Sequence, residues 1–201
     1  MKKINTYTNY IIILSTIAGG FLNGYSYLLK GKVFATMQTG NLILATLHFL
    51  DANYIIAINY FIPIIFFMMG NYIGLYIKQD QKKIQINIII LILIALLTAN
   101  SLNIITNILI AIVSGIQIQT FKTLSNISFA TTMCTGNISK LAQSLYHQNS
   151  KNALLYFMII LSFVFGVVLA SVTTKLFNHY AIFIVVITSI INMLLIAKNT
   201  N

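Results

Sequence analysis

The tripeptide Thr-Gly-Asn occurs twice, as Thr39-Gly40-Asn41 and as Thr135-Gly136-Asn137, and each copy closely follows Phe-Ala-Thr. Glycine accommodates a turn, threonine caps a helix, and an asparagine side chain hydrogen-bonds backbone that has left a helix. A helix that starts at such a break directs its free N–H groups, and a partial positive charge, toward the break. Two such starts facing each other would form a site for a small polar or anionic solute. In the alternative, each tripeptide only caps a packed helix and binds nothing.

Three further polar side chains are candidates for the same site. Asn23, Gln117 and Gln119 lie at equivalent or nearby positions in the first apolar segments of the two halves. They either line the site or only form hydrogen bonds between helices. Lys140 is the only charge expected to enter the membrane. It serves either as a counter-charge for an anion or as a residue whose long stem reaches the membrane surface.

The charged residues exclude most catalytic chemistry. The two acids, Asp51 and Asp80, both lie in breaks between apolar segments, and the three histidines lie near segment ends. Carboxylate acid–base pairs and carboxylate metal sites are therefore not available in the membrane. The single Cys134 excludes an internal disulfide. We expect no enzyme, no metal and no cofactor.

The composition indicates an integral membrane protein. Of 201 residues, 58% are hydrophobic and 7% are charged, and the mean hydropathy is +0.88. A soluble domain carries about 25% charged residues. The net charge of +10 comes from lysines scattered between apolar runs. Lysines in such positions orient membrane segments and do not form a nucleic-acid surface.

The chain divides into two halves, residues 1–99 and 100–201, and each half holds four apolar segments. These lie at residues 10–29, 33–50, 54–77, 84–99, 104–121, 127–146, 153–176 and 180–197. Most of them are long enough to cross a hydrocarbon core of about 30 Å.

The two halves align as an internal repeat. Residues 20–36 match residues 115–131 without a gap, and one inserted residue then superposes the two Thr-Gly-Asn tripeptides. Further along, Gly70 and Gly74 fall on Gly166 and Ala170. This spacing of small residues lets helix backbones approach closely in lipid.

The second segment of each half is interrupted by its Thr-Gly-Asn. The ten residues that follow would form a helix of roughly 15 Å, half a bilayer. We therefore expect six full transmembrane helices and two re-entrant segments that enter as extended chain and leave as half-helices. This topology places the amino and carboxyl termini in the cytoplasm with nine lysines, and leaves only Lys30, Lys32 and Lys175 outside. Eight full crossings give a weaker asymmetry of seven against four. With three crossings per half, the repeats are inverted, a common plan of secondary transporters.

The motifs also resemble a known family. Five segments are similar to motifs of the YoaK-like bacterial membrane proteins. They are Gly20-Phe-Leu-Asn-Gly, Gly31 to Phe34, Gly115-Ile-Gln117, and the two Thr-Gly-Asn regions, the second of which begins at Thr131. The resemblance implies a multi-pass inner-membrane protein with six spans and no settled activity. Asn23 stands where that family commonly has an acid, and Gln117-Ile118-Gln119 replaces its Gln-Asn-Ala. A proton-coupling role based on that acid is not expected here.

The leading hypothesis is a permease for a small solute in the bacterial inner membrane, with its site between the two tripeptides. The rival is a membrane protein whose repeat is purely architectural and which acts through partner proteins.

Overall fold

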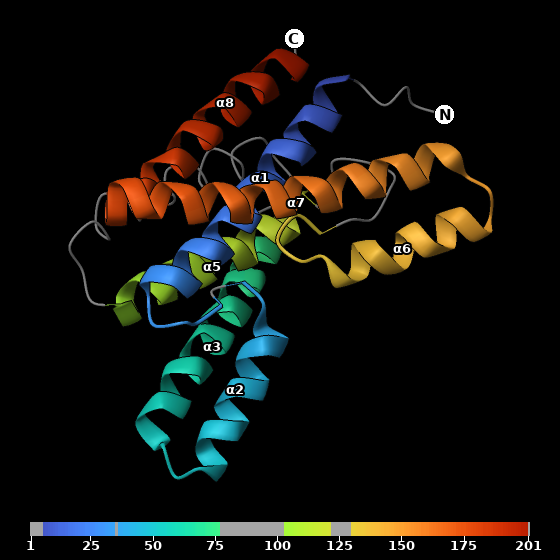
Figure 1. Ribbon diagram of the computed structural model, residues 1–201. Coiled ribbons are helices and arrows are strands. Elements are labelled where there is room, and N and C mark those ends of the chain that lie inside the picture. Colours follow the sequence, from blue (N-terminus) through green and yellow to red (C-terminus); the bar gives the residue numbers. More distant parts are fainter. Residues whose placement is uncertain (1–5, 35, 77–102, 122–129, 201) are drawn as a thin grey trace.

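A computed structural model describes residues 6–34, 36–76, 103–121 and 130–200. These residues form seven α-helices and one short 3₁₀ helix, and no strand occurs among them (Figure 1). The expected segment at 84–99 lies outside the described residues. The elements are α1 (Thr6–Leu29), α2 (Gln38–Leu50), α3 (Tyr54–Tyr76), α5 (Asn103–Phe121), α6 (Thr135–Tyr146), α7 (Ser150–Phe177), η1 (Asn178–Ile182) and α8 (Phe183–Thr200).

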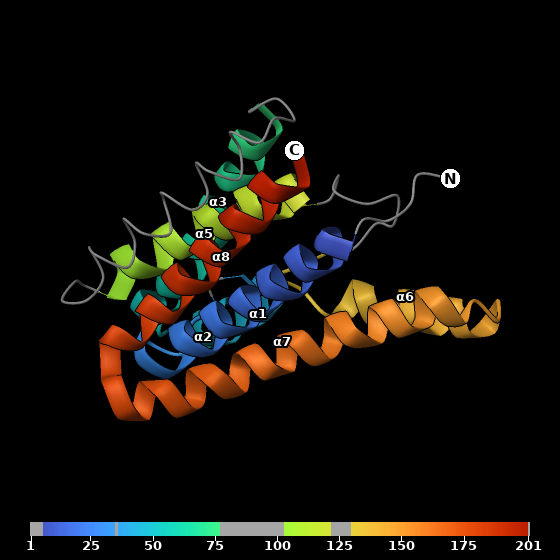
Figure 2. The same cartoon turned by 90° about the horizontal axis from the view of Figure 1, so that it is seen from above.

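The described helices suit a membrane. Thr8–Leu29, Tyr54–Tyr76 and Ser150–Ile196 are long and apolar enough to cross one, and Asn103–Gln119 is a shorter apolar helix. The longest stretch turns at η1, and α1 lies between α7 and α8 and packs on both (Figure 2). Large apolar side chains point outward along α3 and α7, and Ile55 is 79% exposed. Apolar outer faces of this extent favour contact with lipid over contact with water.

The long helices pair crosswise between the two halves of the chain. Helix α1 packs along α7, and α3 packs along α5. Small residues permit both contacts: a Cβ on Gly20 would collide with the Phe163 backbone, and a Cβ on Gly115 would collide with the Phe67 backbone. Phe67 and Phe163 are partners in the sequence alignment, so the two contacts are equivalent.

The expected close approach at the second set of small residues is also present. A Cβ on Gly70 would collide with the Ile112 carbonyl, and a Cβ on Gly166 would collide with the Ile17 carbonyl. One helical turn further on, a Cβ on Gly74 would collide with the Gln119 side chain, and a Cβ on the equivalent side of the repeat, at Gly24, would collide with that of Ala170. From Gly20–Phe163 to Gly24–Ala170 the residue numbers rise together, and so they do from Phe67–Gly115 to Gly74–Gln119. Helix α1 therefore runs parallel to α7, and α3 runs parallel to α5.

Helices α1 and α5 run in opposite directions. Near the start of α1, the Ser15 carbonyl accepts a 3.1 Å hydrogen bond from Gln117 Nε2, near the end of α5. Past the end of α1, the Lys30 carbonyl accepts a 2.8 Å hydrogen bond from Asn107 Nδ2, near the start of α5. The apolar core beside this contact joins α1, α5, α7, η1 and α8 around Phe21, Tyr25, Val113 and Ile182.

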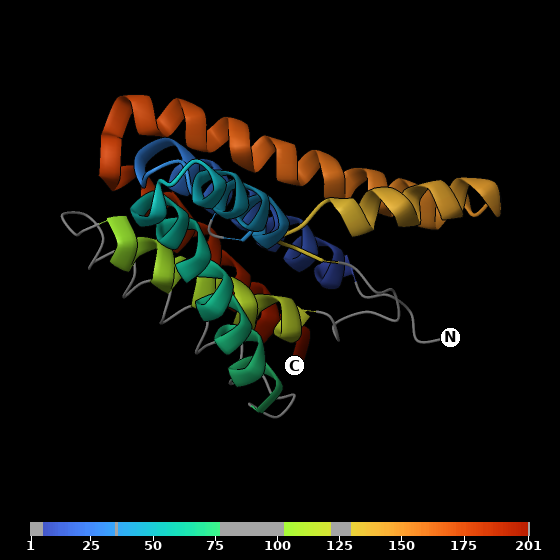
Figure 3. The same cartoon turned by 90° about the horizontal axis from the view of Figure 1, so that it is seen from below.

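The two short helices belong to hairpins at opposite ends of the molecule. Helix α2 packs on α3, and α6 packs on α7. The α6–α7 turn lies on the side of the amino terminus, and the α2–α3 turn lies on the opposite side (Figures 1 and 3). With 13 and 12 residues, α2 and α6 are about 20 and 18 Å long, which is less than a bilayer core.

Candidate functional site

A single asparagine holds the non-helical chain in front of α2. Asn41 is buried, its Oδ1 accepts a 2.9 Å hydrogen bond from the Phe34 amide, and its Nδ2 donates to the Phe34 carbonyl and to Gln38 Oε1. The side-chain amide thus pairs with both polar groups of one backbone residue, as a neighbouring strand would. The preceding turn uses Gly31 and Lys32, both with positive φ.

Asn137 does the same in front of α6. Its Oδ1 accepts from the Ala130 amide at 3.2 Å, and its Nδ2 donates to the Ala130 carbonyl at 2.7 Å and to the Met133 carbonyl at 3.0 Å. The prediction that these asparagines hydrogen-bond broken backbone is therefore confirmed.

The asparagine bonds correct the register of the repeat. Each asparagine reaches back seven residues, so Phe34 is equivalent to Ala130 and Thr36 to Thr132. The inserted residue was expected between Thr36 and Thr39, but it lies before Phe34. The two Phe-Ala-Thr sequences are therefore not structurally equivalent, because they are shifted by one residue relative to each other.

Two expectations for the tripeptides are wrong. The residues before α2 and α6 are Met37 and Cys134, and neither helix start has a side-chain cap. Because the helices begin at or before the tripeptides, Thr39 and Thr135 lie within the first turn, exposed on the outside. Gly40 and Gly136 are helical, without positive φ, so neither makes the turn.

The two breaks meet at residues just before the tripeptides. Thr36 and Thr132 are completely buried, and Thr36 Oγ1 donates to the Thr132 carbonyl at 3.1 Å. Asn23 of α1 bridges them: its Nδ2 donates to Thr36 Oγ1, its Oδ1 accepts from the Thr36 amide at 3.4 Å, and the Thr132 carbonyl lies 3.5 Å from Nδ2. Of the predicted site residues, Asn23 is the one that contacts both breaks.

More polar groups follow the same face of α1, at the spacing Ser15, Gly19, Asn23. The Thr131 and Thr132 backbone packs on Gly19, and Asn192 Nδ2 of α8 donates to Ser15 Oγ at 3.0 Å. Together with the Gln117 bond to Ser15, these contacts define a central polar cluster. Its members, each at most 5% exposed, are Ser15, Asn23, Thr36, Ser114, Gln117, Thr131, Thr132 and Asn192. Ser114 is included because it lies one helical turn before Gln117 on α5.

Five atoms of the central polar cluster are without a hydrogen-bond partner within the described part of the chain. They are the hydroxyl oxygens of Ser114, Thr131 and Thr132 and the amide oxygens of Gln117 and Asn192. A buried polar atom left unpaired costs about 1–3 kcal/mol, so such atoms in proteins normally bind water or a ligand.

Lys140 and Gln119 lie apart from the central polar cluster. Lys140 lines a polar cavity of about 270 Å³ between α6 and α7. Gln119 Nε2 donates to Asn71 Oδ1 at 2.9 Å, between α5 and α3. The structure therefore does not bring Lys140 together with Asn23 and Gln117.

A second buried polar group lies past the end of α1. Lys30 is 1% exposed, and burial lowers the pKa of its ammonium group. Nearby, the Tyr25 hydroxyl donates to the His179 carbonyl at 3.1 Å, which ties α1 to η1. These residues therefore connect the end of α1 to η1 and, through the Lys30 carbonyl, to Asn107 near the start of α5.

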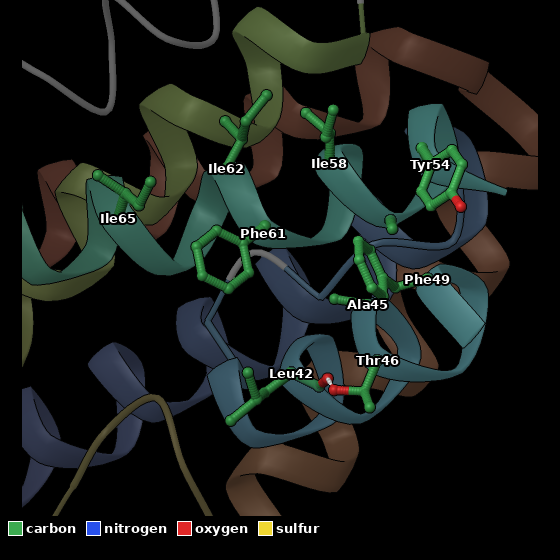
Figure 4. A pocket seen from close by; sticks show the side chains of 10 residues that line it. Leu42, Ala45, Thr46, Phe49, Tyr54, Ile58, Phe61, Ile62 and Ile65 are labelled. Carbon is green, nitrogen blue, oxygen red and sulfur yellow. Dashed lines mark hydrogen bonds between the residues drawn. The ribbon is translucent and has the colours of Figure 1, made fainter. Parts of the chain in front are cut away.

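An apolar cavity lies elsewhere. Figure 4 shows its walls between α2 and α3, with a volume of about 400 Å³. The Thr46 hydroxyl in its wall donates to the Leu42 carbonyl at 2.9 Å and so offers no free donor. The cavity fits a hydrocarbon chain and has no group for a polar solute.

The sequence patterns did not single out most of the central polar cluster. Thr36, Thr131 and Thr132 stand out in the sequence only through the repeat and the family motifs, and no motif distinguishes Ser15, Ser114 and Asn192. The available signal was the spacing of four residues between Ser15, Gly19 and Asn23 on one face of α1.

The family described as a protein of unknown function, DUF1275, matches residues 11–195. The chain belongs to this family. The match covers both breaks and every residue of the central polar cluster, and it agrees with the resemblance to YoaK-like proteins, which DUF1275 includes. No curated protein and no solved structure matches the chain. The function of this DUF1275 protein therefore has to be argued from its own residues.

Proposed function

We propose that this protein is a permease for a small, uncharged polar solute, and that the solute binds at the central polar cluster. The observation that carries the proposal is the set of five unpaired oxygen atoms in this cluster, which extends along α1 from the meeting point of the breaks at Asn23 to Ser15, about 12 Å away. In a membrane these atoms have no bulk water to bind, so a solute or its hydration water has to satisfy them. None of the eight cluster residues is charged, which favours an uncharged solute over an anion.

We also propose the inverted six-span topology for this site. Antiparallel α1 and α5 support it, because eight full crossings would make the first helices of the two halves parallel. The equivalent glycine contacts support the duplication. In this topology α2 and α6 are half-helices that return from mid-membrane, and both chain termini lie in the cytoplasm of a bacterium.

Nearly complete burial of the cluster corresponds to a closed state. Transport then requires α1 and α7 to move relative to α3 and α5, so that the cluster opens to one side at a time. The proposal includes no catalytic step, since no carboxylate lies in any apolar segment.

One observation favours the rival, architectural function. The side-chain amide oxygen and nitrogen of Asn41 both form hydrogen bonds to the backbone of its own break, and so do those of Asn137. Neither tripeptide asparagine is therefore left to bind a solute. A protein that only packs two half-helices would need these bonds and nothing else. It would not need the five unpaired atoms.

Cysteine labelling separates the two functions. In a Cys134→Ala background, a small charged thiol reagent should react with Thr36→Cys and Thr132→Cys from at least one side of the membrane. Ile65→Cys is the matched control, because Ile65 is 43% exposed but lies on the apolar α2–α3 cavity. A reagent that reaches neither Thr36→Cys nor Thr132→Cys would overturn the permease proposal.

Transport itself is measured by the osmotic swelling of proteoliposomes with a panel of uncharged polyols, amides and ureas. The expected result is faster swelling with the native protein than with Thr132→Val, for at least one solute. Equal rates across the panel would contradict the proposal.

A further inference from the structure

The polar cavity between α6 and α7 is lined in part by residues that differ in polarity from those at the equivalent positions of α2 and α3. Lys140 and Gln143 line it from α6, His147 lies at the turn, and Asn149, Asn152 and Tyr156 line it from the α7 side. In the register of the repeat, Lys140 is equivalent to Leu44, Gln143 to Leu47 and Asn152 to Ile56. The apolar cavity of the α2–α3 hairpin is lined by other positions, none of which corresponds to a lining residue of the polar cavity. The positions of Lys140, Gln143 and Asn152 are leucine or isoleucine in the first half, so the repeat does not require polar residues there.

The charge of this hairpin favours an anion. Lys140 lies in the wall and Lys151 at the start of α7, while the chain contains no Asp or Glu after Asp80. The amide groups of Gln143 and Asn152 add neutral hydrogen-bond donors. Ammonium and amide donors together are the usual partners of a phosphate group.

The surroundings of the cavity favour an amphiphile over a free ion. Ile138 and Leu145 on α6, and Leu154 and Phe157 on α7, are exposed large apolar side chains on the same hairpin. A headgroup in the polar cavity would therefore have apolar side chains beside it for acyl chains. The α6–α7 turn lies on the side of the amino terminus (Figure 1), which is the cytoplasmic side in the topology proposed above. Anionic lipids are concentrated in that leaflet.

We propose that the α6–α7 cavity binds the phosphate headgroup of an anionic phospholipid from the cytoplasmic leaflet, with Lys140 as the principal cationic contact. The choice of leaflet rests on the proposed topology. The binding itself does not depend on transport.

The test is thermal unfolding of the purified full chain in neutral detergent, with phosphatidylglycerol, phosphatidylcholine or inorganic phosphate added. Phosphatidylglycerol should raise the unfolding temperature in a saturable way, and the other two should not. Lys140→Leu, which introduces the residue of the equivalent position, should weaken the apparent affinity roughly fivefold, the effect of one lysine near an anionic surface. Asn152→Ile introduces the residue of the equivalent position on the α7 wall, and it should weaken the apparent affinity as well.

Lys175→Leu is the matched control, because Lys175 lies at the far end of α7 and is exposed. It should leave the phosphatidylglycerol response unchanged, and so should Thr132→Val, which separates this site from the permease site. An equal response to phosphatidylcholine, an equal response to free phosphate, or an equal loss in Lys175→Leu would each overturn the proposal.

Discussion

At the scale of single residues, one asparagine amide organises each break. Asn41→Leu would leave the Phe34 amide and carbonyl unpaired, and Asn137→Leu would do the same to Ala130. Each variant should lose about 2–4 kcal/mol of stability, since each unpaired buried group costs about 1–3 kcal/mol. Gly136→Ala is the control, because a Cβ there meets no atom within 4 Å. Thermal unfolding in one detergent measures all three, and asparagine variants as stable as Gly136→Ala would contradict this role.

The same scale shows how the two breaks differ. Asn23 gives the Thr36 hydroxyl a partner, but its equivalent on α5 is Ile118, and the Thr132 hydroxyl is unpaired. Ile118→Asn should supply the missing partner, raise the stability by about 1 kcal/mol and reduce solute permeation. The measurements are unfolding temperature and liposome swelling, with Ile118→Leu as the control. A lower unfolding temperature than that of Ile118→Leu would contradict the equivalence of the two positions.

Residue roles were only partly predictable from the sequence. The asparagine bonds are local, spanning seven residues, and the repeated tripeptide pointed to them. The burial of Thr36 and Thr132 depends on which distant segments cover them, and no local pattern carries that information. The capping prediction for Thr39 failed because the helix begins earlier, at Gln38.

At the scale of elements, glycines set the distance between the paired helices. Gly20→Ala and Gly115→Ala would each drive a methyl group into the backbone of the facing helix, at Phe163 and at Phe67. Overpacking of this kind costs about 1–3 kcal/mol. The two variants should lose similar amounts of stability if their contacts are equivalent, and each should lose more than Gly136→Ala. A loss in only one of them would argue against the duplication.

The helices themselves were the most predictable elements. The described α1, α3, α5 and α7 lie close to the apolar segments at 10–29, 54–77, 104–121 and 153–176, because long apolar runs form helices in lipid. The crosswise pairing of α1 with α7 was not predictable, since hydropathy shows which segments are buried in the membrane and says nothing about their neighbours.

At the scale of the whole molecule, the direction of the repeats decides what the two breaks can do together. Inverted repeats bring both half-helix starts to one level in the membrane from opposite sides, whereas parallel repeats would place them on the same side. The bond between Thr36 and Thr132 requires that the breaks meet, and antiparallel α1 and α5 agree with inversion.

Inversion makes a direct prediction for the two hairpin turns. In a Cys134→Ala background, Asp51→Cys and Asn149→Cys, both exposed, should react with an impermeant thiol reagent from opposite faces of the membrane. Asn178→Cys, at the exposed turn between α7 and η1, is the internal control and should label with Asp51→Cys, because α7 crosses once between residues 149 and 178. Labelling of residues 51 and 149 from one face would establish parallel repeats. It would also place the two half-helix starts on one side, where they could not share a central site.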